Sequence, residues 1–72
     1  MYLGWYDPSK HRTSAQKITD AAARYRRKWG REPVVALVNP ADACEVEGIK
    51  VRVVNHVAPN TFFVGEDEVY PW

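Results

Sequence analysis

The chain has 72 residues, of which 46% are hydrophobic and 12% aromatic, and its formal net charge is +1. This composition excludes an intrinsically disordered chain and predicts one globular domain over residues 1–72. So short a domain buries only about 60% of the surface that its unfolded chain exposes, so we expect modest stability unless the core is well packed or the chain associates.

The lone cysteine, Cys44, excludes an internal disulfide. The sequence shows no charged-then-apolar leader and no apolar run long enough to cross a membrane, so we expect a cytoplasmic protein. Charge is divided along the chain. Residues 1–36 hold eight Lys or Arg against three Asp or Glu, a net of +5, whereas residues 37–72 hold two against six, a net of −4. Such asymmetry indicates either a nucleic-acid face or two complementary ends of a molecule that pairs with itself.

Residues 2–6 are dense in aromatic and aliphatic side chains, and Asp7 with Pro8 follows as a turn, which favours a short strand. A helix over about residues 14–29 comes next. Thr13 and Gln16 have the spacing of a capping box, and Gly30 and Pro33 end the helix. Its apolar side chains recur with helical period and predict a face turned to the core: Ile18, Ala21, Ala22, Tyr25 and Trp29.

The other side of this helix is basic. The favoured interpretation is a solvated surface, and the alternative is a site for phosphate or an acidic partner. For nucleic acid, cations would follow the phosphates and Trp5 or Tyr2 would stack on bases. The cations of this alternative are Lys10, Arg12, Lys17, Arg24, Arg27, Lys28 and Arg31.

Residues 34–38 are apolar without alternation, as expected of a central strand covered on both faces. Asn39 and Pro40 predict a short helical turn over roughly residues 40–45. Residues 49–54 alternate between apolar and polar, and residues 61–64 follow turn chemistry at Pro59 and Asn60, so we expect these two segments to form a hairpin.

No catalytic or ligand-binding pattern is present. His11, His56 and Cys44 lack metal-ligand spacing, and Cys44 is interpreted as a small core residue rather than a nucleophile. The four glycines are dispersed, so no phosphate-cradling loop is formed, and the carboxylates of residues 66–68 imply no pocket. We therefore expect no enzyme activity, cofactor, metal or small-molecule substrate.

Two segments resemble known proteins. The helix end at Trp29, Gly30 and Arg31, with Pro33 and the strand ending in Asn39 and Pro40, resembles small uncharacterised bacterial proteins that share an aromatic-Gly-Arg-x-Pro stop. That resemblance implies no activity. Residues 48–65 resemble a strand-turn-strand unit of phage capsid subunits, but they use common hairpin chemistry and the rest of the capsid fold is lacking.

The sequence thus predicts a two-layer α+β fold, with one main helix on a three- or four-stranded mixed sheet. The core is expected to contain Ile18, Ala22, Tyr25, Trp29, Val35, Leu37, Val51, Val53, Phe62 and Val64. The predicted function is a binding or interaction module that forms a homo-oligomer, with nucleic-acid binding as the alternative. Its interface would use exposed aromatics together with either the edge strand 61–64 or the tail 69–72. The tail is expected to dock either on a second copy or on its own sheet. The expected interface residues are Tyr2, Trp5, Phe63, Tyr70 and Trp72.

Overall fold

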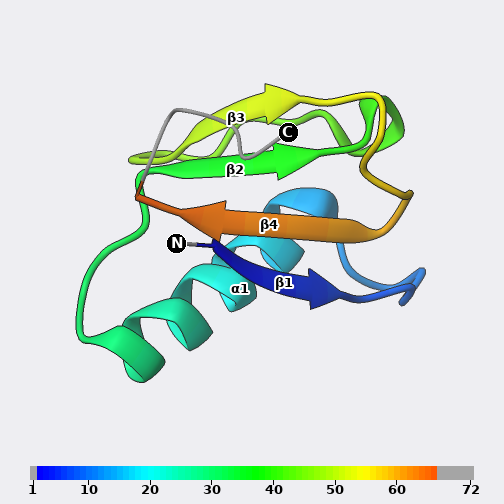
Figure 1. The fold of residues 1–72 in the computed structure, drawn as a ribbon. Coiled ribbons are helices and arrows are strands. Elements are labelled where there is room, and N and C mark those ends of the chain that lie inside the picture. The colour runs from blue at the N-terminus through cyan, green and yellow to red at the C-terminus, as the bar shows by residue number, and fades with distance from the viewer. Residues whose placement is uncertain (1, 67–72) are drawn as a thin grey trace.

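A computed structural model describes residues 2–66, in which one α-helix packs on a four-stranded mixed sheet (Figure 1). The elements in chain order are β1 (Tyr2–Tyr6), α1 (Ser14–Trp29), β2 (Val35–Val38), the 3₁₀ turn η1 (Pro40–Asp42), β3 (Lys50–Val53) and β4 (Thr61–Gly65). The predicted two-layer α+β class is confirmed.

Both ends of α1 are specified by neighbouring residues. The Thr13 side chain accepts a hydrogen bond from the Gln16 amide, and the Gln16 side chain accepts one from the Thr13 amide, which completes the capping box. At the other end Gly30 adopts the left-handed conformation, with φ of 69°, and donates its amide to the Arg26 carbonyl. The predicted helix limits are therefore confirmed.

The sheet has the strand order β1-β4-β2-β3. Strand β4 is antiparallel to both of its neighbours, and β2 and β3 are parallel. The predicted hairpin between residues 49–54 and 61–64 is therefore wrong, because β2 lies between these strands. The expectation that residues 61–64 form an edge is also wrong, since β4 is internal and the margins are β1 and β3 (Figure 1).

The connection from β3 to β4 passes over the end of β2 because it is anchored there. Val54 and Val57 are buried and pack with Val35 and Leu37 on the sheet face opposite α1. The Asn39 side-chain amide donates to the Val57 carbonyl at 2.8 Å, which fixes the connection beside the end of β2. A hairpin would expose these two valines and lose this bond.

The main core lies between α1 and the sheet. Ile18, Ala21 and Tyr25 of α1 are fully buried against alternate residues of β2 and β4. Of the predicted core, Ile18, Ala22, Tyr25, Val35, Leu37, Phe62 and Val64 are buried, and Trp29 and Val51 are partly buried. Val53 is 51% exposed, so its assignment to the core is wrong. The reason is position: α1 packs on β4 and β1, whereas Val53 lies on the opposite margin.

Candidate interaction surface

Strand β1 offers its backbone at one margin of the sheet. The Asp7 amide donates to the Asn60 carbonyl at 2.9 Å, in line with the register that pairs Trp5 with Phe62. Along an antiparallel ladder, residues bonded to the neighbouring strand alternate with residues whose backbone groups point away. Trp5 therefore bonds towards β4, and Gly4 and Tyr6 direct their amide and carbonyl groups outward from the sheet.

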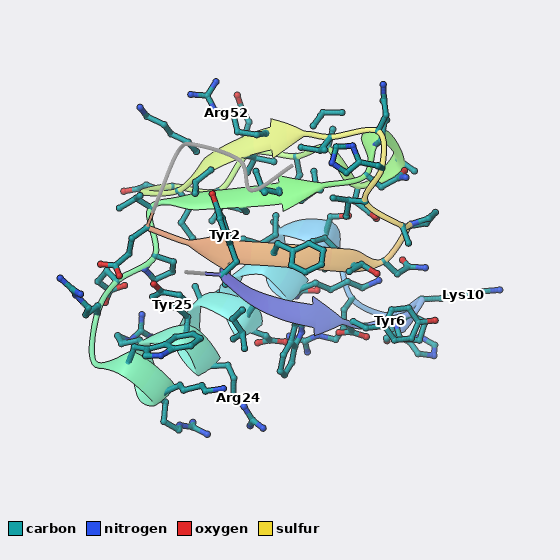
Figure 2. All side chains as sticks on the ribbon, viewed as in Figure 1. Tyr2, Tyr6, Lys10, Arg24, Tyr25 and Arg52 are labelled. Carbon is teal, nitrogen blue, oxygen red and sulfur yellow. The ribbon has the colours of Figure 1, made fainter. Side chains whose placement is uncertain are left out.

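The side chains of β1 do not protect this margin. The strand contains no charged residue, Gly4 is exposed, and Tyr6 is 68% exposed. Figure 2 shows the Tyr6 side chain at the C-terminal end of β1. The margin at β3 differs, because Lys50 and Arg52 lie along it. Charged side chains on edge strands oppose pairing with other chains. Of the two margins, β1 is thus the one suited to receive another strand.

A hollow of about 220 Å³ adjoins β1 on its helix side, lined by Trp5, Asp20, Ala23, Arg24 and Arg27. Its four helical residues form one stripe of α1. The Arg24 guanidinium carbon lies 5.8 Å from the centroid of the Trp5 ring, in a cation-π arrangement. The Trp5 Nε1 is buried and has no hydrogen-bond partner in the described part of the chain. An unpaired buried donor costs about 1–3 kcal/mol, so an acceptor that reached this atom would stabilise the site.

The seven cations of the nucleic-acid alternative occupy different environments. Lys17 is only 4% exposed and its Nζ donates to Asn60 Oδ1 at 3.3 Å, so its expected place on a solvated face is wrong. Arg12 forms ion pairs with Asp7 and Asp20, and Arg31 Nε lies 3.3 Å from Glu66 Oε1.

The remaining cations divide between the two ends of α1. Arg24 and Arg27 share the hollow, and Lys28 Nζ lies 5.0 Å from the centroid of the Trp29 ring. Lys10 lies on the connection before the helix, away from Arg24 (Figure 2). Of the seven cations, the structure thus brings Arg24 and Arg27 together in one hollow.

The predicted interface aromatics lie on different faces. Tyr2 and Phe63 pack beside Val35 and Leu37 on the face opposite α1, whereas Trp5 faces the helix side. The Phe63 ring, on the paired position of β4, explains why residue 4 is a glycine, because a Cβ at this position would lie only 3.1 Å from Phe63 Cε1. Tyr70 and Trp72 lie outside the described residues.

A second hollow, of about 540 Å³, lies on the connection between β2 and β3, lined by Cys44, Glu45, Val46, Glu47, Ile49 and Val51. Burial raises the pKa of the Cys44 thiol, and the neighbouring Asp42 carboxylate raises it further. The thiol therefore stays protonated at neutral pH and is a poor nucleophile and metal ligand. Within residues 2–66, no group of three His, Cys, Asp or Glu residues could hold a metal ion.

A polar cluster at the end of β2 was missed by the sequence analysis. The buried Asp42 carboxylate accepts from the Asn60 amide at 2.8 Å and from the Ser14 hydroxyl at 3.4 Å. Asn60, with φ of 64°, accepts from Lys17. The cluster therefore joins the start of α1 to η1 and to the turn before β4. The only sequence signals were Asn39 and Asn60, which mark turns and do not identify their distant partners.

Comparison of the chain with protein-family models, curated proteins and solved structures finds no match. The resemblance at the end of the helix thus stays a prediction. Among the described residues, no helix has both the length and the apolar character needed to cross a membrane.

Proposed function

We propose that the chain is a small non-catalytic interaction module that self-associates through the outer margin of β1. The observation that supports this function is the combination found there: outward backbone groups at Gly4 and Tyr6, an exposed aromatic side chain and no charge. Natural proteins usually cover or charge such an edge, and pairing with another strand satisfies it.

The placement of the reactive side chains supports a non-catalytic role. Ser14, Lys17 and Asp42 hydrogen-bond within the polar cluster that fixes three segments of the fold. Cys44 is kept protonated by burial and by Asp42. Ser14, Lys17 and Asp42 line neither of the hollows described above, and Cys44, which lines the one on the connection between β2 and β3, carries a protonated thiol there.

Sedimentation velocity of the chain at increasing concentration tests self-association. We expect a dimer at high micromolar concentration, and we expect Tyr6→Lys to return it to a monomer because it places a charge on the pairing margin. Val53→Lys is the matched control, since Val53 is also an exposed strand residue, at 51%, but lies on the other margin. A monomer at every concentration, or equal loss of the dimer in both variants, would contradict the proposal.

Nucleic-acid binding is the second candidate, favoured by one observation: Arg24 and Arg27 share a hollow with an aromatic ring. Cations that contact phosphates, with a ring available for stacking, suit single strands. Band shifts with single- and double-stranded DNA and RNA at low and moderate salt test it. We expect Arg27→Gln to weaken binding and Arg26→Gln, whose arginine is paired with Glu32, to have a smaller effect. Failure to bind at low salt would exclude this function.

A further inference from the structure

We propose that the self-associated form is a two-fold dimer in which the β1 strands of two copies pair antiparallel with Gly4 on the axis. This inference rests on the proposed self-association and adds the register, the helix contact and the residues that meet. It would join the two four-stranded sheets into one continuous sheet, with both helices on the same side.

The backbone pattern of β1 favours this register. Residues that face each other in an antiparallel pair have their side chains on the same side of the sheet. When a strand pairs with its own copy, one residue must therefore face the same residue of the partner, and the two-fold axis lies midway between them. With Gly4 at the axis, the outward amide and carbonyl groups of Gly4 meet those of the partner's Gly4, and Tyr6 meets the partner's Tyr2. Centring on Leu3 or Trp5 would leave two residues at one end of β1 without a facing partner in the other strand.

The side chains of β1 agree with the same register. Leu3 would lie beside the partner's Trp5 on the helix side, and Tyr6 beside the partner's Tyr2 on the other face. Aromatic and aliphatic pairs across strands contribute roughly 0.2–1 kcal/mol each. Gly4 places no side chain at the axis. By contrast, antiparallel pairing of β3 with itself would bring Lys50 and Arg52, or two copies of Arg52, face to face, which is unfavourable.

The helices are placed to meet across this junction. Because α1 packs on β4 and β1, pairing at β1 sets the two helices side by side. In Figure 2 the Arg24 side chain points away from the sheet, beyond β1.

The hollow beside Trp5 lies on the side where the helices approach each other. The two-fold axis reverses the second helix, so the end of each helix that carries Arg24 and Arg27 lies towards the half of the other that carries Asp20, whose carboxylate is already paired with Arg12 of its own chain. The hollow, which Trp5 lines, is covered by the second copy.

Amide hydrogen exchange of the unsubstituted chain tests the pairing without mutation. On raising the concentration from low to high micromolar, we expect exchange at Gly4 and Tyr6 to slow by about tenfold or more as their outward amides become bonded. Val51 and Val53 on the margin at β3 serve as internal controls and should not change. Slowing at β3 instead of β1, in a chain that sediments as a dimer, would overturn the proposed geometry and leave self-association standing.

Disulfide trapping then tests the register. In a Cys44→Ser background, Tyr2→Cys and Tyr6→Cys are placed on separate chains of different mass, mixed and oxidised. We expect the mixture to give the crosslinked pair and each chain alone to give none. In the proposed register, two cysteines at the same position would be four residues apart along the strands, about 13 Å, whereas a disulfide spans roughly 4.4–6.8 Å between Cα atoms. Crosslinking of either chain with itself, or none in the mixture while Cys44→Ser is dimeric, would overturn the register. A monomeric Cys44→Ser chain would overturn the proposed function as well.

Discussion

The two connections that lead to parallel strands are built differently. Residues 7–34 join β1 to β2 through α1, whose Ile18, Ala21 and Tyr25 are fully buried. Residues 39–49 join β2 to the neighbouring parallel strand β3, and their only helical element is the turn η1. Neighbouring parallel strands usually need a crossover that contains an α-helix.

The difference lies in what holds each connection in place. The α1 connection is stabilised by fully buried apolar residues along a periodic stripe. In the η1 connection Cys44, Val46 and Ile49 are only partly buried against the core, and hydrogen bonds of Asn39 and Asp42 fix its start. A buried polar group stabilises a structure only while its partners are in place. The η1 connection should therefore be sensitive to the loss of single atoms and the α1 connection to the loss of volume.

The largest effect is expected from Phe62→Ala, which removes a fully buried ring on β4 from the core beneath α1. Such truncations cost about 3–5 kcal/mol, comparable with the whole stability of so small a domain. Urea unfolding followed by circular dichroism measures it, with Phe62→Leu as a milder variant that should still fold. Val53→Ala, at the exposed margin, should change the free energy of unfolding by less than about 1 kcal/mol.

Asp42→Ala should cost about 2–3 kcal/mol, because it leaves the Asn60 amide and the Ser14 hydroxyl without their acceptor. Urea unfolding gives this value too, and Asp42→Asn, which keeps one side-chain oxygen, should lose less. Glu45→Ala is the matched control, since Glu45 is exposed on the same connection. If Asp42→Ala were as stable as Glu45→Ala, the polar cluster would not hold this connection.

Asn60→Ala and Asn60→Gly separate backbone strain from hydrogen bonding. Both remove the acceptor for Lys17, but only alanine is strained at φ of 64°. We expect the alanine variant to be less stable than the glycine variant by about 1–2 kcal/mol in thermal or urea unfolding. Equal stabilities would show that the turn can relax out of the left-handed region.

Thr13→Ala tests the capping box of α1 and should cost about 1 kcal/mol, because the Gln16 amide loses its acceptor. Thr19→Ala is the control, because Thr19 is an exposed residue of the same helix whose hydroxyl bonds the Ala15 carbonyl and caps no helix end. Urea unfolding measures this loss of stability. If Thr13→Ala left the free energy of unfolding unchanged, packing alone would fix the start of α1.

The smallest effect concerns Cys44, whose pKa is raised by burial and by Asp42. In the unfolded chain the thiol ionises at its ordinary pKa, whereas in the folded chain it ionises only at a higher pH. The free energy of unfolding therefore decreases as the pH rises from the ordinary pKa towards the raised one. We expect slow alkylation by iodoacetamide near neutral pH and faster alkylation in Asp42→Asn. An unchanged rate in that variant would show that the carboxylate does not influence the thiol.

Sequence patterns identified the parts of this fold that depend on neighbours in the chain. The capping residues Thr13 and Gln16 and the left-handed Gly30 gave the limits of α1, and the unbroken apolar run gave the central strand β2. The alternation at residues 49–54 identified β3 as a strand, but it misplaced Val53, which is exposed, and Val54, which is buried. These features are local because capping, helical period and strand alternation are set within a few residues.

Only the tertiary structure decided which strands are neighbours and which side chains meet. Strand alternation is the same in a hairpin and in a parallel pair, so it could not reveal that β4 inserts between β1 and β2. Nor could it show that Lys17 is buried against Asn60, since a lysine on a basic helix face has the same pattern when solvated. The margin at β1 and its hollow arise from this strand order, because a strand becomes an edge only through the placement of the others.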